Sequence, residues 1–285
     1  MNALPSESKV MRPVLRWHGG KFRLAPWIRS FFPKHRIYVE PFCGAASVLM
    51  TKPRAWGEYI NDLDGEIVNL FRVLQDDTRS RELVRLLTLT PFAKAEYELA
   101  REVTDDPIER ARRLCILSFM GFSSGAATGD KTGFRSKSFR SNVGPGQDWM
   151  NYPEKLWAVI DRLRGVTIEN RPALEIIPSL DTPGTLFYVD PPYPASTRKN
   201  FGAYRHELTD EDHEALAECL RACSGYVLIS GYRCDLYDRL YDGWIRMEKK
   251  TMCDHGYRQE SLWLSPRTAD VVLKTKQLSL MGAGA

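Results

Sequence analysis

Residues 185–194 read TLFYVDPPYP, a run of β-prone residues that ends in an aspartate, two prolines and a tyrosine. The run predicts a buried strand, and the prolines predict its end because proline has no amide hydrogen to donate to a neighbouring strand. Ligands of open α/β sheets bind at the carboxyl ends of strands. We therefore expect the side chains of Asp190 and Tyr193 to face a crevice.

The same turn has the groups that a planar amine requires. The Asp190 carboxylate and the Pro191 carbonyl are two acceptors for the hydrogens of an NH2 group, and Tyr193 offers a flat ring for a base. Pro191 and Pro192 fix the turn and leave that carbonyl without competition from an adjacent amide. Taken alone, the stretch is equally compatible with a strand-ending turn and a solvated aspartate.

Similar short apolar runs occur at residues 37–39, 58–60 and 226–230. Helical patterns lie between several of them, at residues 65–74 and 210–222, and Thr209 with Asp212 has the spacing of a capping box. Strands that alternate with helices predict an α/β fold with a parallel or mostly parallel sheet.

This alternation stops in the second quarter of the chain. Helical patterns follow one another directly, and a Gly/Ser/Ala-rich and then basic segment follows them at residues 121–146. The predicted helices are at residues 79–87, 91–101 and 107–119. We expect an α/β core formed by residues 1–75 and 151–285, interrupted by a mainly helical insertion at residues 76–150.

The chain carries 40 Lys and Arg against 36 Asp and Glu, a net charge of +4, but its cations are unevenly distributed. Residues 9–36 hold eight basic side chains and no acidic one. A second acid-free stretch holds Lys131, Arg135, Lys137 and Arg140. Two such patches on a nearly neutral chain indicate a polyanionic partner.

No apolar run approaches the ~20 residues of a membrane span, and the N-terminus lacks the apolar stretch of a signal peptide. The six cysteines form no C-x-x-C pair and no regular framework, so we expect free thiols and no metal site. A cytoplasmic location and no membrane partner are the corresponding expectations.

Three further features predict a ligand site. Residues 38–47 read YVEPFCGAAS, a strand that runs into a turn of small residues, which lets a ligand approach the backbone. This turn is not the G-x-G-x-x-G fingerprint of dinucleotide sites. Asp62 ends the next strand, where an acid commonly binds ribose hydroxyls, with a helix cap as the alternative. Residues 15–21 read LRWHGGK. A solvated basic face would require neither the tryptophan nor the glycine pair, so this stretch indicates a more specific role than a run of charges does.

The motifs occur in the order Arg-Trp-x-Gly-Gly-Lys, Val-Glu-Pro-Phe-x-Gly-x-x-Ser, Asn-Asp, an insertion and Asp-Pro-Pro-Tyr. This order resembles the Dam-type (class alpha, D12) DNA adenine methyltransferases, in particular members encoded by phages and prophages. The resemblance covers nearly the whole chain, since residues 204–207 and 262–264 also match. It implies a Rossmann-like S-adenosylmethionine-dependent methyltransferase core with a helical target-recognition insertion, in a monomer that acts on double-stranded DNA.

The resemblance also implies roles for individual residues. Trp17 and Lys21 close over S-adenosylmethionine, and Asp62 binds its ribose. The cofactor turn consists of Glu40, Pro41, Phe42, Cys43, Gly44, Ala45 and Ser47. The flipped adenine is held by the turn Asp190, Pro191, Pro192 and Tyr193, of which Asp190 also faces the methionine end of the cofactor. A hairpin near residues 120–140 enters the DNA, and the residues expected to contact DNA are Arg16, Lys131, Arg135, Lys137, Arg140, Arg198, Lys199 and Tyr204.

Three departures from the family pattern matter. Ala46 replaces the second glycine of the cofactor turn, which narrows the approach to the backbone. Pro172 stands where relatives often have an acid near the adenine of the cofactor, so the residue that contacts this ring is left open. The loop at residues 123–141 does not match the hairpin that reads GATC in Dam itself, so no recognition sequence is implied.

Two alternatives to adenine methylation are left. A methyltransferase for the exocyclic amine of cytosine uses the same geometry, usually with Ser in place of Asp190. A DNA-binding or occlusion protein without turnover would keep the same surfaces, although the intact turn at residues 190–193 counts against it. Methylation at cytosine C5 needs a nucleophilic cysteine in a motif of its own, whereas Cys43 lies in the cofactor turn.

Overall fold

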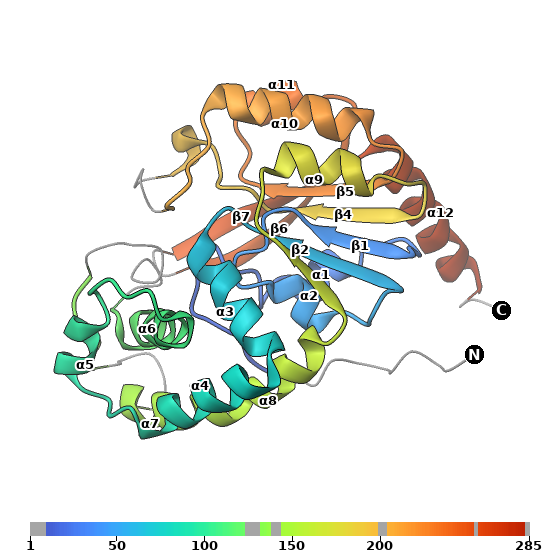
Figure 1. Cartoon of the computed structure of the whole chain (residues 1–285). Helices are drawn as coiled ribbons and strands as arrows, with labels where there is room; N and C mark the ends of the chain where they lie inside the picture. Colours follow the sequence, from blue (N-terminus) through green and yellow to red (C-terminus); the bar gives the residue numbers. More distant parts are fainter. Residues whose placement is uncertain (1–9, 123–131, 138–143, 199–203, 254–255, 283–285) are drawn as a thin grey trace.

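The computed structural model describes residues 10–122, 132–137, 144–198, 204–253 and 256–282. Within these residues the chain forms a seven-stranded sheet in the order β3-β2-β1-β4-β5-β7-β6 (Figure 1). The strands are β1 (Ile37–Glu40), β2 (Gly57–Asn61), β3 (Val166–Glu169), β4 (Thr185–Val189), β5 (Tyr226–Gly231), β6 (Ile245–Cys253) and β7 (Gly256–Leu264). Strands β1 to β5 are parallel, whereas β7 runs antiparallel to both β5 and β6. The parallel part has the 3-2-1-4-5 order of doubly wound nucleotide-binding sheets.

Both faces of the central strands are covered. Val39 and Phe187 lie in one cluster of buried side chains, and Tyr38 and Leu186 lie in another. Neighbouring side chains of a strand point to opposite faces, so this alternation places one apolar layer on each side of the sheet. One layer is formed with α9 (Ala173–Leu180), α10 (Asp210–Ala222) and α11 (Asp235–Leu240), which lie together above the sheet in Figure 1. The other is formed with α1 (Ala25–Arg29), α2 (Ser47–Thr51), α3 (Gly65–Gln75) and α12 (Pro266–Gly282).

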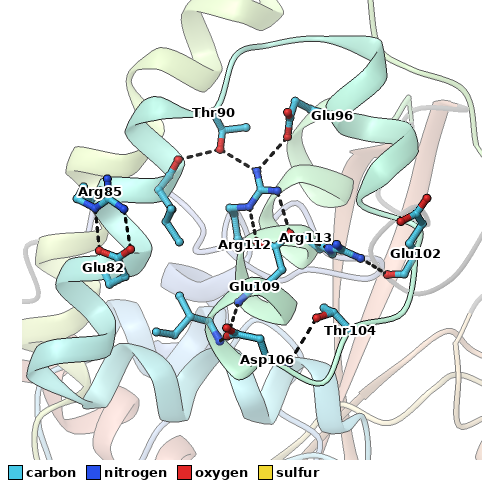
Figure 2. Close-up of polar contacts among 12 residues, drawn as sticks. Glu82, Arg85, Thr90, Glu96, Glu102, Thr104, Asp106, Glu109, Arg112 and Arg113 are labelled. Atoms are coloured by element: carbon cyan, nitrogen blue, oxygen red, sulfur yellow. Dashed lines mark hydrogen bonds and ion pairs between the residues drawn. The ribbon is translucent and has the colours of Figure 1, made fainter.

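Further helices lie between α3 and β3: α4 (Asp77–Leu89), α5 (Lys94–Leu99), α6 (Pro107–Met120), α7 (Pro145–Met150) and α8 (Tyr152–Leu163). Asp76 and Asp106 begin α4 and α6 by accepting hydrogen bonds from backbone amides of the first turn. The guanidinium of Arg112 on α6 binds Glu96 of α5 at 3.0 Å, and it also binds Thr90 and Glu109 (Figure 2). The buried side chains of α4 and α6 share one apolar cluster with those of α3, so these helices pack directly on the core.

A buried ionic cluster fixes α8 to the sheet. Glu58 of β2 accepts hydrogen bonds from the Lys52 ammonium at 2.7 Å and from two guanidinium nitrogens of Arg162 at 2.6 and 2.8 Å. All three side chains are buried. Removal of Glu58 would leave two buried cations without a counter-charge, which costs about 3–5 kcal/mol.

Several predicted elements are confirmed and others were missed. Strand β4 follows the predicted run, and α10 begins with the predicted capping box, in which Thr209 and Asp212 exchange hydrogen bonds. Helix α5 is shorter than the helix predicted at residues 91–101, because the backbone at Ala93 is still extended. The hairpin of β6 and β7 and the helices α8, α9 and α12 were not predicted. None of the described helices is long and apolar enough to cross a membrane.

Candidate active site

A cleft opens at the carboxyl ends of β1, β2 and β4. Its empty space, counted with the solvent at its mouth, is about 870 Å³. Asp190 and Pro192 of the predicted catalytic turn line this cleft, and Pro191 and Tyr193 are buried beside it. The lining includes every residue predicted to bind the cofactor: Trp17, Lys21, Glu40, Pro41, Phe42, Cys43, Gly44, Ala45, Ser47, Asp62 and Asp190.

The turn after β1 lies directly against an aromatic ring. Gly44 has a φ of +44°, and a Cβ atom there would lie 2.7 Å from Nε1 of Trp17, so a side chain would have to displace the indole. Ala46 is also left-handed, with a φ of 48°, where a glycine would be relaxed. The amide of Gly44 donates a hydrogen bond of 2.8 Å to Asp62, which ties the turn to the end of β2. Trp17 of the N-terminal motif thus packs on the turn.

Glu40, the last residue of β1, is a buried carboxylate. Its Oε1 atom accepts hydrogen bonds from the Tyr38 hydroxyl at 2.7 Å and from the Leu49 amide at 2.6 Å. Burial raises the pKa of Glu40 to about 7, although both hydrogen bonds oppose the shift. A cation that bound beside Glu40 would favour its ionised form.

Asp62 follows β2, and burial raises its pKa to about 6. Its carboxylate accepts hydrogen bonds from the amides of Gly44 at 2.8 Å and of Asp64 at 2.9 Å. The residue that caps α3 is Asp64, which accepts from the Glu66 amide and binds the Arg205 guanidinium with both oxygens. The helix-cap alternative therefore applies to Asp64, and Asp62 fixes the turn instead.

Asp190 is held by two residues from different parts of the chain. Its Oδ1 atom lies 3.0 Å from the Lys21 ammonium and 3.2 Å from the Tyr193 hydroxyl. Burial raises the pKa of Asp190, and the Lys21 charge opposes this shift. Burial acts to lower the pKa of Lys21, but the carboxylates of Asp190 and Glu260 together raise it. Lys21 therefore stays charged inside the cleft.

One carboxylate of this site was not predicted. Glu260 of β7 is buried, accepts a hydrogen bond from the Tyr193 hydroxyl, and lies 3.6 Å from the Lys21 ammonium. Its only sequence signal is an acid directly before the apolar run at residues 261–264. That signal does not relate Glu260 to Asp190, because the relation depends on the order of the strands.

The N-terminal basic stretch lies beside the base of the predicted hairpin. Gly121 and Phe134 form an antiparallel bridge, and the Arg16 guanidinium lies 3.4 Å from the Gly121 carbonyl oxygen. The Phe134 ring packs on Phe92 with 5.0 Å between centroids, so this ring is part of the helical packing. Lys137 lies beyond the bridge and is exposed.

The other predicted DNA contacts are more enclosed. Arg135 lies 3.6 Å from Asp148, and its side chain is 14% exposed. The Arg198 guanidinium is paired with Glu207, and its side chain is 7% exposed. Tyr204 lines the cleft. The remaining predicted DNA contacts, Lys131, Arg140 and Lys199, lie outside the described part of the chain.

The motifs that line this cleft also match known proteins. Residues 17–254 match the family described as D12 class N6 adenine-specific DNA methyltransferase. The chain belongs to this family. It is 26% identical over 257 residues to the type II methyltransferase M1.LlaDCHI of Lactococcus lactis subsp. cremoris, covering 85% of this chain and 88% of that protein. It is 28% identical to a DNA adenine methylase of Vibrio cholerae, covering 82% and 86%, and 29% identical to one of Salmonella typhi, covering 79% and 82%.

This D12 methyltransferase is therefore an enzyme that methylates adenine in DNA. The predicted family, enzyme class and α/β methyltransferase fold are confirmed. The family and its relatives support adenine methylation. They do not support the two alternatives, which were methylation of the cytosine amine and DNA occlusion without turnover. The reaction requires a methyl donor as well as DNA.

Proposed function

We propose that the protein transfers a methyl group from S-adenosylmethionine to N6 of an adenine flipped out of double-stranded DNA. The observation that carries this proposal is that the small-residue turn at residues 40–47 and Asp190 line the same cleft. A direct transfer needs a ligand-binding turn and an acceptor for the amine on the same side of the sheet, because the two reactants must meet in one geometry.

The charge of the cleft favours a cationic ligand. Its lining has more carboxylates than cations: Glu40, Asp62, Asp64 and Asp190 against Lys21 and Arg205. S-adenosylmethionine fits this surplus because its sulfur is positively charged, whereas the sulfur of the demethylated product is neutral. When bound, it supplies an electrophilic methyl group, whose bond to sulfur breaks as the amine nitrogen takes the carbon.

We assign the parts of the cleft to parts of this cofactor. Gly44 lets the Trp17 indole pack on the backbone of the turn that lines the cleft, and Asp62 at the end of β2 accepts hydrogen bonds from the ribose hydroxyls. Leu63 and Ala173 are apolar residues of the lining beyond Asp62. We propose that they pack on the adenine ring of the cofactor, which replaces the contact of the acid that other members have near position 172.

Asp190 acts on the amine that is methylated. Its carboxylate and the Pro191 carbonyl accept the two amine hydrogens, which draws the nitrogen lone pair out of conjugation and makes it more nucleophilic. Asp190 also accepts the proton that the nitrogen loses after transfer. The Tyr193 hydroxyl is anchored by Glu260, so the ring is fixed before a base arrives.

For DNA, we propose that residues 76–150 form the target-recognition region of the enzyme. The support is the proximity of Arg16 to the hairpin base at Gly121 and the exposure of Lys137 beyond it. Phosphate contacts from such cations position a protein on the duplex, and contacts to base edges select the sequence. Tyr204 lines the cleft and the Arg198 guanidinium lies 5.4 Å from the centroid of its ring, so both would act on the flipped nucleotide.

The test is to methylate an unmodified plasmid and to read the modified positions by single-molecule sequencing. We expect N6-methyladenine that depends on S-adenosylmethionine and is lost in Asp190→Ala. Asp270→Ala is the matched control, because Asp270 is an exposed acid paired with Lys274 on α12. The cofactor should also raise the Tm of the protein. Methylated cytosine amines, or a bound cofactor without methylated DNA, would contradict the proposal.

A further inference from the structure

Glu260 is a buried carboxylate close to the reacting groups. On β7, the neighbouring Ser261 pairs with Gly231 at the end of β5, so Glu260 reaches the same edge of the sheet as Asp190. Its exposed fraction is 5%. A carboxylate at such a position is strongly destabilising unless it is paired and hydrogen-bonded. The partners of Glu260 therefore indicate its role.

These partners are the same two residues that contact Asp190. The Tyr193 hydroxyl donates to Glu260 and lies 3.2 Å from Asp190. The Lys21 ammonium lies 3.6 Å from Glu260 and 3.0 Å from Asp190, and 4.9 Å from the Tyr193 ring centroid. Two carboxylates thus face one phenol and one ammonium.

The phenol has one hydrogen, so it serves one carboxylate at a time. Glu260 is the nearer acceptor and takes this hydrogen. Asp190 then keeps the ion pair with Lys21 on Oδ1, and its Oδ2 receives no hydrogen bond from the described residues. If Glu260 were absent, the Tyr193 hydroxyl would donate its hydrogen bond to Asp190. It would then compete with an amine for the Asp190 carboxylate.

We propose that Glu260 is a positioning residue for methyl transfer, which takes the Tyr193 hydrogen and so leaves the Asp190 carboxylate free to accept the adenine amine. This inference rests on the proposed roles of Asp190 and Tyr193. Glu260 touches neither substrate in this account and acts through these two residues.

The first test compares two replacements of Glu260 in single-turnover methyl transfer. Glu260→Ala removes the acceptor, and we expect the rate to fall about 100-fold, the usual effect of a misplaced catalytic group, with little change in affinity for S-adenosylhomocysteine. Glu260→Gln keeps an oxygen acceptor, and we expect a smaller loss. Because glutamine is isosteric, this variant keeps the test valid if the alanine variant does not fold.

The second test asks whether the phenol hydrogen causes the loss. In Glu260→Ala/Tyr193→Phe the competing hydrogen is gone, and we expect the rate to recover roughly 10-fold over Glu260→Ala, as coupling between contacting residues allows. A purely structural role for Glu260 predicts no recovery, because the second substitution would only remove another contact.

The pH profile gives an independent readout. The charge of Glu260 contributes to the raised pKa of Asp190, after burial. Glu260→Gln should therefore move the acid limb of the kcat/KM profile to lower pH. The other ionisable groups that face Asp190 are unchanged in this variant: Lys21, Glu40, Tyr188, Tyr193, Tyr204 and Tyr237.

Glu248→Gln is the matched control, because Glu248 lies on the adjacent strand β6 and pairs with Arg246. The inference is overturned if Glu260→Ala transfers methyl groups as fast as Glu248→Gln, or if Tyr193→Phe worsens the Glu260→Ala defect. Failure of the proposed function gives another pattern, since the wild-type protein would then not methylate adenine or Asp190→Ala would stay active.

Discussion

The ammonium of Lys21 lies 3.0 Å from the carboxylate of Asp190, which joins the N-terminal Gly-Gly-Lys motif to the turn at the end of β4. Lys21 thereby holds the acceptor that we assign to the adenine amine, and it lines the same cleft as the small-residue turn. The pair brings together two stretches that we assign to the methyl-transfer site.

Replacement of Asp190 by alanine should lower turnover by at least about 100-fold while affinity for DNA is retained. The carboxylate polarises the amine chiefly in the transition state, so its loss affects kcat more than binding. Rates of methyl transfer and gel-shift titrations of the same variant test both parts. An Asp190→Ala protein with a near wild-type rate would show that the amine is held elsewhere.

Replacement of Asp62 by alanine should raise the dissociation constant of S-adenosylhomocysteine about 10- to 100-fold, the usual worth of a charged hydrogen bond. Asp62→Asn keeps an acceptor for the Gly44 amide but loses the charge, so it separates the ribose contact from support of the turn. Calorimetric titration measures both variants. If Asp62→Ala binds as tightly as wild type, Asp62 serves only the turn.

Replacement of Glu40 by glutamine should change how stability depends on pH. Burial raises the pKa of Glu40 in the folded protein to about 7 from its usual value of 4.5, so its protonated form stabilises the fold, and this contribution is lost as pH rises through 7. At pH 8 the glutamine variant should be more stable by up to about 3 kcal/mol. Melting temperatures of the two proteins at pH 5 and 8, without cofactor, test this. Parallel curves for the two proteins would contradict it.

Neutralising Lys131 and Lys137 should weaken binding to all DNA sequences alike. Each lost phosphate contact flattens the dependence of log affinity on log salt by about one unit of slope. Lys94→Ala is a suitable control, because Lys94 is an exposed residue paired with Glu98 on α5. Binding measured across salt concentrations decides the point, and an unchanged slope would direct attention to the N-terminal stretch around Arg16.

Replacement of Arg135 should change which adenines are methylated, if its guanidinium leaves Asp148 to reach a base edge in the major groove. Asp148→Asn removes the charge that pairs with Arg135, so it should make it easier for the Arg135 guanidinium to leave residue 148. Sequencing of modified sites for both variants shows the effect. A methylation pattern that is unchanged in Arg135→Ala would leave this arginine as part of the ion pair with Asp148 alone.

Features encoded by neighbouring residues were predictable without coordinates. The strand at residues 185–189 ends at an aspartate and two prolines, and the capping box of α10 needs only Thr209 and Asp212. Backbone propensities, proline geometry and capping act over a few residues, so the amino-acid order is sufficient for them. The same holds for the turn at residues 40–47, whose small residues are contiguous.

The contacts across the cleft depended on the assembled sheet. Nothing near Glu260 in the chain relates it to Tyr193, and the two meet because β7 inserts antiparallel beside β5. The ion pair of Lys21 with Asp190 likewise joins residues far apart in the chain. Strand order and burial are set by how distant segments pack together, and it is this packing that converts a local Asp-Pro-Pro-Tyr turn into a charged, enclosed site.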